Sequence, residues 1–207
     1  MKKLLTLFII MASFMLVNTA MANDGRDPVE MLQSLANQMI ESLKANKTTL
    51  KSNPQKSYAL AYKIVVPHAD IAEMSKRVLP PQAWNNATTQ QRAKFESEFT
   101  QLLIRTYASA LSDYENQTIQ FFPIRGGYQG KSNVIVSSQI TRSDGSPLGV
   151  NYSLISKPSG WKLYDMTVEG ISLLESFHSQ FADKLSQGNM DNLISELEKH
   201  NAARSGS

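Results

Sequence analysis

The sequence predicts an α+β fold in which helices cover a short antiparallel sheet. Apolar residues recur at helical spacing between residues 28 and 114, they alternate with polar residues from 117 to 168, and helical spacing returns from 171 to 200. Helices on both sides of a meander of about four strands are typical of an α+β domain. We expect the helices of the N-terminal half and of the C-terminus to cover the sheet and to enclose an apolar pocket.

The first 22 residues resemble an export signal rather than part of the fold. Lys2 and Lys3 precede an apolar run from Leu4 to Val17, and Ala20-Met21-Ala22 supplies the small side chains of a cleavage site. The run is shorter than the roughly 20 residues of a membrane-spanning helix. We therefore expect a cleaved signal peptide over 1–22, a single domain over 23–201 and a disordered tail over 202–207.

Charge and cysteine content narrow the function classes. Two of the 21 Lys and Arg side chains lie in the predicted signal peptide, which leaves 19 against 18 Asp and Glu. Such a chain lacks the basic stripe that nucleic-acid binding requires, so no nucleic acid is expected as a partner. A polybasic anchor for anionic lipid is also absent. Because there is no cysteine, packing alone must hold the exported domain together.

Proline and capping residues divide the N-terminal half into helices. Asp27-Pro28 and Asn53-Pro54 each join an N-cap residue to a proline of the first turn. A short helix is expected over 70–79, where Pro80-Pro81 ends it and leaves Trp84 in a connection. Thr88-x-x-Gln91 forms a capping box that opens a helix over 88–114.

Two of these helices carry long apolar stripes. The first stripe comprises Leu32, Leu35, Ala36, Met39, Ile40 and Leu43, and the second comprises Phe95, Phe99, Leu102, Leu103, Tyr107, Ala110, Leu111 and Tyr114. Stripes of this kind are usually plain core.

Alternation predicts strands over 117–124, 132–142, 148–156 and 161–168, with turns at Ser143–Ser146 and Lys157–Gly160. Helices are expected over 171–186 and 190–200. We expect Gly170 to connect the strand over 161–168 directly to the helix over 171–186. This arrangement would place Met166, Val168, Ile171 and Leu174 around one apolar corner.

The corner also carries a family resemblance. The segment Tyr164-Asp165-Met166-x-x-Glu169-Gly170-Ile171-Ser172 resembles the signature of the MlaC family, the periplasmic phospholipid-binding components of the Mla lipid transport system, also known as toluene-tolerance proteins. Val66-Pro67-His68, the segment from Trp84 to Phe121 and the segment from Gly188 to Leu197 are similar to further parts of that family.

The resemblance implies a soluble periplasmic carrier and not an enzyme. Such a carrier shuttles phospholipid between outer- and inner-membrane complexes and so maintains outer-membrane lipid asymmetry. The implied partners are phospholipid, the inner-membrane Mla ABC transporter complex and the outer-membrane lipoprotein–porin complex. No cofactor is expected apart from phospholipid as cargo. Two acyl chains have about 30 methylenes, and at about 0.8 kcal/mol each their exposure to water disfavours a free lipid by on the order of 20 kcal/mol.

We expect the apolar side chains of the second stripe, the sheet and the corner to line the phospholipid pocket: Phe95, Phe99, Leu102, Leu103, Tyr107, Leu111, Tyr152, Leu154, Met166, Val168, Ile171 and Leu174. A carrier must also release its cargo, so its wall should deform. Met39, Met74 and Met166 are flexible side chains suited to that task.

Two other functions stay open. A small exported enzyme acting on a hydrophobic substrate would use Asp165 or Glu169 as general acid or base. Alternation places Asp165 on the strand face opposite Met166, and Glu169 can accept backbone N–H bonds at the helix start, which favours structural roles for both. A periplasmic adaptor would use the apolar helix face as a protein interface.

The remaining candidate motifs predict no chemistry. Gly126 to Ser132 resembles a phosphate-binding loop, but Arg125 replaces the required first glycine and a strand, not a helix, follows. His68, His178 and His200 lie in separate segments without the spacing of metal ligands, so no metal site is expected. His178, at the edge of an apolar helical face, is expected to be a packing or boundary residue.

Overall fold

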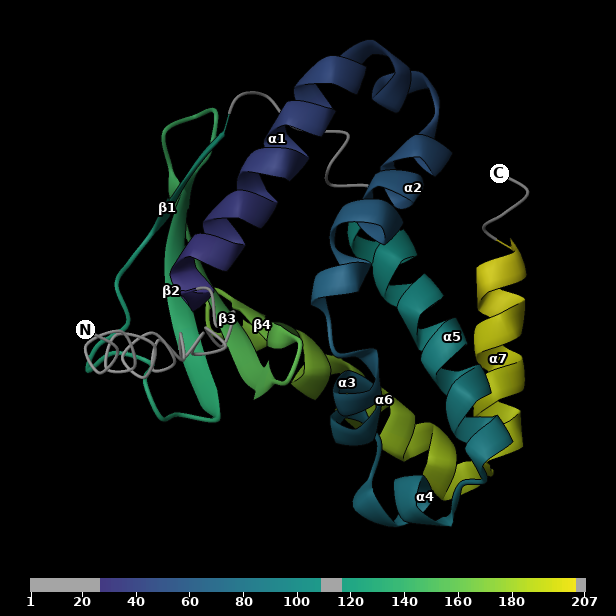
Figure 1. The fold of residues 1–207 in the computed structure, drawn as a ribbon. Helices are drawn as coiled ribbons and strands as arrows, with labels where there is room; N and C mark the ends of the chain where they lie inside the picture. Colours follow the sequence, from purple (N-terminus) through teal and green to yellow (C-terminus); the bar gives the residue numbers. More distant parts are fainter. Residues whose placement is uncertain (1–26, 109–116, 204–207) are drawn as a thin grey trace, which may run out of the picture.

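The computed structural model describes residues 27–108 and 117–203 (Figure 1). The predicted signal peptide lies outside these residues, as do the last residues of the predicted helix over 88–114 and most of the predicted tail. The described chain confirms an α+β fold, in which helices precede and follow the strands of one antiparallel sheet along the sequence.

Helices α1 (Pro28–Ser52) and α2 (Pro54–Ile64) form an antiparallel hairpin at the top of Figure 1. Both start where the sequence predicts. The Asp27 carboxylate accepts the Val29 N–H at 2.7 Å, and the Asn53 side chain accepts the Gln55 N–H at 3.0 Å. These bonds satisfy N–H groups that have no partner within the helix.

A short 3-10 helix, η1 (Val66–His68), leads from α2 to α3 (Ile71–Val78). Asp70 caps α3 by accepting the Glu73 N–H at 3.0 Å. Pro80-Pro81 ends this helix as predicted, but Trp84 does not lie in a connection. It is buried within α4 (Pro81–Asn86), because Pro81 at the first helical position favours a new helix.

Helix α5 (Thr89–Tyr107) begins with the predicted capping box. The Gln91 N–H donates to the Thr88 hydroxyl at 3.1 Å, and the Thr88 N–H donates to Gln91 Oε1 at 2.9 Å. Ala110, Leu111 and Tyr114 of the predicted stripe lie outside the described residues.

The sheet has the order β1-β2-β3-β4-β5, and all neighbours are antiparallel. Its strands are β1 (Thr118–Phe121), β2 (Asn133–Thr141), β3 (Pro147–Lys157), β4 (Gly160–Val168) and β5 (Ile171–Ser172). The four predicted strands are present. In β4 the pairing register shifts, so that Asp165 opposes Ser153 while Leu163 opposes Leu154. Tyr164 is therefore an extra residue, a β-bulge.

The corner after β4 differs from the prediction. The chain does not pass through one glycine into a helix, because Glu169 and Gly170 form a two-residue turn, both with positive φ (49° and 83°). Positive φ at both positions suits a tight hairpin. Ile171 and Ser172 pair back onto Val168 and Thr167 as β5, and α6 (Leu173–Gln187) starts only afterwards.

Helices α6 and α7 (Met190–Ala203) lie to the right of the sheet in Figure 1, where α7 packs beside α5. Helix α7 reaches Ala203, and so includes the first two residues of the predicted tail. The core between α5 and α6 contains four packed rings: the ring centroid of Phe95 lies 5.6 Å from those of Phe99 and Phe181, and that of Phe99 lies 5.6 Å from that of Phe177. A second apolar cluster joins the start of α1 to the sheet.

Candidate functional site

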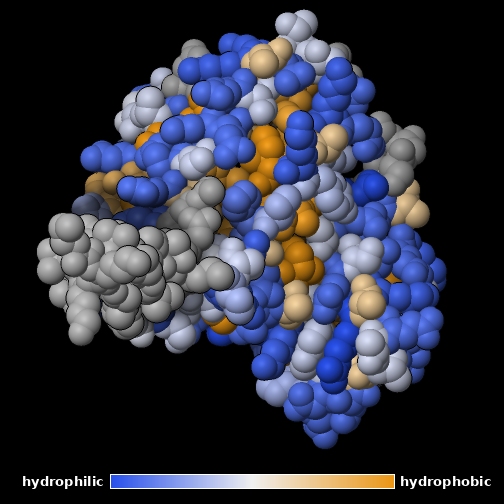
Figure 2. Space-filling view, in the orientation of Figure 1, coloured by the Kyte–Doolittle hydropathy of each residue, from blue (hydrophilic) through white to orange (hydrophobic). Residues whose placement is uncertain are grey.

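A cavity of about 440 Å³ lies between the α1–α2 hairpin, α5 and the inner face of the sheet. Its size falls in the range of small-molecule pockets. Figure 2 shows apolar side chains in a hollow between α1 and α2, surrounded by hydrophilic residues. Almost all lining side chains are apolar: Leu32, Leu35, Ala36, Met39, Ile40, Leu43, Ala61, Val65, Val66, Ala69, Ile71, Met74, Leu103, Ile104, Ala108, Ile119, Phe121, Ile140, Leu163, Met166 and Leu173, with Thr100, Tyr107, Gln117, Tyr152 and Asp165.

The cavity is nearly free of charge. Its lining, within the part of the chain that the structure describes, includes no Lys or Arg. Burial raises the pKa of Tyr152 above 10.0, and burial also raises the pKa of Tyr107. Both phenols are therefore neutral at physiological pH. The site suits an uncharged apolar ligand group.

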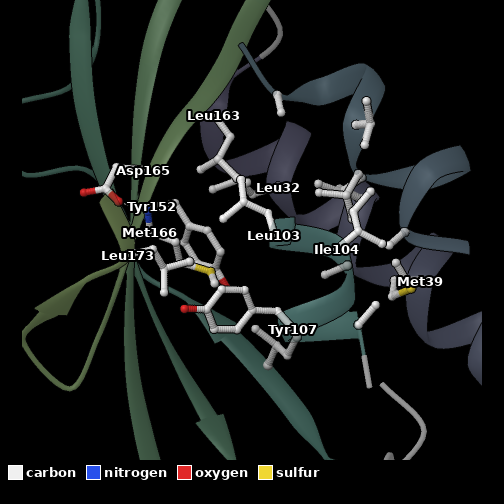
Figure 3. Close-up of a pocket in the computed structure, with 18 of the residues that line it drawn as sticks. Leu32, Met39, Leu103, Ile104, Tyr107, Tyr152, Leu163, Asp165, Met166 and Leu173 are labelled. Carbon is white, nitrogen blue, oxygen red and sulfur yellow. Dashed lines mark hydrogen bonds between the residues drawn. The ribbon is translucent and has the colours of Figure 1, made fainter. Parts of the chain in front are cut away.

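Asp165 is the acidic residue of the described lining, and it directs its carboxylate away from the cavity (Figure 3). Asp165 accepts the Ser172 hydroxyl at 2.7 Å, the Met166 N–H at 2.8 Å and the Leu174 N–H at 3.1 Å. These bonds tie β4 to β5 and to the first turn of α6. As the sequence predicts, Asp165 has a structural role at this corner.

Glu169 also forms structural bonds, but not those expected. Its Oε1 accepts the Gly149 N–H at 2.6 Å, and its own N–H donates to the Gly149 carbonyl at 3.1 Å. It therefore ties the β4–β5 turn to β3 rather than capping a helix start, because β5 separates Glu169 from α6.

The structure brings four of the twelve predicted pocket residues to the cavity: Leu103, Tyr107, Tyr152 and Met166 (Figure 3). All three methionines expected in a deformable wall, Met39, Met74 and Met166, also line it.

The other eight predicted pocket residues do not line the cavity in the described structure. Phe95, Phe99, Leu102 and Leu174 belong to the closed core formed by α3–α7, and Leu154 is fully buried in the cluster between α1 and the sheet. Val168 and Ile171 lie at the β4–β5 turn outside the cavity lining, and Ile171 is 65% exposed. Leu111 lies outside the described residues.

The division of the predicted α5 residues between the core and the cavity has a simple geometric cause. Phe95, Phe99 and Leu102 follow one face of the helix and pack on α6 and α7, whereas Thr100, Leu103 and Tyr107 follow an adjacent face that borders the cavity. Successive residues of an α-helix are about 100° apart, so both faces merge into one broad stripe in the sequence. Only packing distinguishes the core face from the cavity face.

Of the α1–α2 hairpin, only Met39 is assigned to the pocket wall from the sequence by residue. Leu32, Leu35, Met39, Ile40 and Leu43 of α1 all face the cavity. Their helical stripe is plain in the sequence, but a stripe shows that a helix has an apolar face and not what that face encloses.

One wall of the cavity is attached to the sheet by polar contacts. The segment from η1 to α3 contacts β4 where the Asp70 N–H donates to the Leu163 carbonyl at 2.8 Å. Lys157 Nζ lies 2.7 Å from Asp70 Oδ2, and Lys162 Nζ donates to the Pro67 carbonyl at 2.7 Å. Because this segment carries Val66, Ala69 and Ile71, the contacts fix the apolar wall beside β4.

Asp70 should make this attachment pH-dependent. Partial burial acts to raise its pKa, but the hydrogen bond from Lys157, the Glu73 N–H and the nearby ammonium groups outweigh burial and lower the pKa below 3.8. A carboxyl whose pKa is lower in the folded state stabilises the fold above the unfolded value, and this stabilisation is lost as the pH falls through the folded value.

We therefore expect Asp70→Asn to lower the free energy of unfolding at pH 7 by about 0.5–1 kcal/mol, since asparagine keeps the helix cap but loses the ion pair. Urea unfolding at a series of pH values measures this difference, which should shrink as the pH falls below 3.8. Lys94→Gln, which removes a looser exposed contact of 3.8 Å with Glu198, is the control and should show no such trend. An Asp70→Asn difference that is constant with pH would contradict the assignment.

No metal centre or membrane-spanning helix is found in the described ranges. They contain no group of three His, Asp or Glu side chains that could hold a metal ion, and no helix of sufficient length and apolarity to cross a bilayer. His178, the predicted packing or boundary residue, is half-buried, and its Nδ1 lies 3.1 Å from the Val78 carbonyl oxygen.

Comparisons with known proteins agree on one family. The family model described as MlaC protein matches residues 33–199. Toluene tolerance protein ttg2D of Pseudomonas putida is 30% identical over 89% of this chain and 83% of its own length. The intermembrane phospholipid transport system binding protein MlaC of Haemophilus influenzae is 26% identical over 92% of this chain and 88% of its own.

A solved structure is similar as well. The phospholipid-binding protein from Ralstonia solanacearum, determined in complex with a phospholipid, superposes with a TM-score of 0.79 at 31% sequence identity. The match covers 86% of this chain and 98% of the other.

Proposed function

Because the chain belongs to the MlaC family, we propose that it is a soluble periplasmic phospholipid carrier and that the cavity between the α1–α2 hairpin, α5 and the sheet holds the acyl chains. The proposed carrier takes up a phospholipid at one membrane complex and delivers it to another, so that outer-membrane lipid asymmetry is maintained. The two complexes are the inner-membrane Mla ABC transporter and the outer-membrane lipoprotein–porin complex.

The observation that carries this proposal is the neutral, apolar lining of the cavity. Acyl chains need only removal from water, which contributes about 0.8 kcal/mol for each buried methylene. A charged lining would oppose their binding, and the cavity avoids one: its tyrosines are neutral and the Asp165 carboxylate is bonded to backbone and Ser172. The hollow between α1 and α2 leaves room for a headgroup to stay in water.

Flexible side chains suit the release that a carrier requires. Met39, Met74 and Met166 reach the cavity from α1, α3 and β4, three different parts of its wall. Unbranched methionine side chains change rotamer at low cost, so the wall can follow chains of different length and close behind a departing one.

The test is native mass spectrometry of protein purified from the periplasm without detergent or denaturant. We expect a mass increment of a diacyl phospholipid, identified after solvent extraction. Protein that carries its apo mass alone would refute the carrier proposal. A bound apolar molecule without a phosphate headgroup would show that the cavity serves another ligand.

The enzyme alternative makes a different prediction for Asp165. As a structural residue, it should tolerate Asp165→Asn with a fall in the free energy of unfolding of about 1–3 kcal/mol, because bonds to a charged acceptor are replaced by weaker ones. Phospholipid incubated with the wild type should yield no lysolipid or free fatty acid by mass spectrometry. Products formed by the wild type and lost in Asp165→Asn and in Glu169→Gln would instead support hydrolysis.

A further inference from the structure

Strand β2 has an open backbone edge beside the loop that precedes it. β1 pairs with β2 from Ser138 to Thr141, and the last backbone bond between the two segments runs from the Phe122 N–H to the Ser137 carbonyl at 2.9 Å. Pro123 follows and has no N–H to donate. The chain then turns away through two tight turns, closed by Gly127 N–H to Ile124 and Lys131 N–H to Tyr128.

The start of β2 is therefore paired on one side only. Ser132 accepts a bond from Ser156, so the even-numbered residues here direct their backbone groups to β3 and the odd-numbered ones to the opposite edge. Asn133 and Ile135 thus present N–H and C=O groups outward, and no backbone partner for them exists among the residues that the structure describes. Unpaired edge groups of this kind are a template for another strand.

The side chains around this edge form a groove that is both apolar and positively charged. A cavity of about 710 Å³ lies along the loop and β2, and its apolar lining comprises Phe122, Pro123, Ile124, Val134, Ile135 and the β4 residue Tyr164. Ile135 is 59% exposed and Phe122 38%, which are unusual values for such large apolar side chains. Arg125 and Lys131 also line the groove, whereas its described lining contains no Asp or Glu. The groove is therefore apolar and positively charged.

From this combination we propose that the β2 edge binds an extended acidic peptide segment of a partner protein, which adds a strand to the sheet beside Asn133–Ser137. The open N–H and C=O groups require a partner with a peptide backbone, which a lipid surface does not supply. Arg125 and Lys131 select carboxylates, and Ile135 with Phe122 selects apolar side chains at alternate positions. The occupant is a strand in which acidic and apolar residues alternate.

This surface is separate from the acyl-chain cavity. Along β2, Val134 and Val136 are buried on the inner face while Ile135 points to the outer face, and the cavity is lined from the inner face by Phe121 and Ile140. A partner segment can therefore remain bound at the edge while lipid enters or leaves the cavity.

The experiment titrates the ¹⁵N-labelled full domain with the peptide Glu-Val-Glu-Val-Glu-Val-Glu and follows backbone amide resonances. We expect saturable shifts that centre on Asn133–Ser137 and weaken at least about tenfold between low and high salt. The lysine counterpart of the peptide, and the same acidic peptide with alternate amides N-methylated in either register, should bind at least about tenfold more weakly.

Two variants test the protein side. Arg125→Glu with Lys131→Glu reverses the groove charge at exposed positions and should abolish binding, whereas Arg142→Glu at the β2–β3 turn should not. Ile135→Pro removes one edge N–H, a change that an edge strand tolerates.

Absence of shifts at millimolar peptide, N-methylated peptides that bind equally well, or co-sedimentation with anionic phosphatidylglycerol vesicles in place of peptide binding would each overturn the proposal. Self-association through β2, seen as a dimer that Ile135→Pro dissolves, would overturn it too.

Discussion

Leu103→Asp is expected to reduce the phospholipid that co-purifies with the protein by at least about tenfold. Leu103 reaches the cavity from α5 and is only partly buried, so an aspartate there can fold into place with water still present. When acyl chains fill the cavity, the carboxylate loses that water, and the described lining contains no Lys or Arg to compensate, so burial of the charge is strongly unfavourable. Quantitative lipid extraction per mole of folded protein measures the effect.

Ile171→Glu is the matched control. Both changes introduce a carboxylate within the set of residues that the sequence assigned to the pocket, but Ile171 lies 65% exposed in β5, outside the cavity lining. Its glutamate stays in water, so lipid content should equal that of the wild type. Equal lipid loss in both variants, or none in Leu103→Asp despite a native circular dichroism spectrum, would remove the cavity as the acyl-chain site.

Local signals in the sequence predict most of the elements correctly. The Asp27, Asn53 and Thr88 caps lie at the starts of α1, α2 and α5, because each uses a side chain to satisfy N–H groups a few residues away. Alternation likewise locates the first four strands, β1 to β4. Signals of this kind need no knowledge of tertiary contacts, which is why a single sequence contains them.

The pocket depends on tertiary contacts and was only partly predictable. Leu163 and Met166 both line the cavity although they are three positions apart, a spacing that regular alternation assigns to opposite faces. The bulge at Tyr164 reverses the alternation between them, and nothing in the local pattern marks its position. The β4–β5 turn is likewise hidden in the sequence pattern. Ile171 continues the helical spacing of α6 but pairs with Val168 as a strand.

Phe99→Ala should have the largest effect on stability, a loss of about 3–5 kcal/mol in the free energy of unfolding. Phe99 is fully buried and its ring contacts those of Phe95, Phe177 and Phe181, so truncation leaves a void that the close-packed rings cannot fill. Urea unfolding of the lipid-free protein measures the loss. Lipid content per folded molecule should stay near the wild-type value, because Phe99 does not line the cavity.

Leu103→Ala is the comparison that separates core from cavity on the same helix. Truncation at a wall that already borders open space creates little new void, so only the transfer term applies, and the loss should stay below about 2 kcal/mol. If both variants lost the same free energy in the lipid-free protein, the space beside Leu103 would be filled by side chains in solution, and an acyl chain would have to displace them. A clear difference instead means that α5 separates a closed aromatic core from a cavity held open for a ligand.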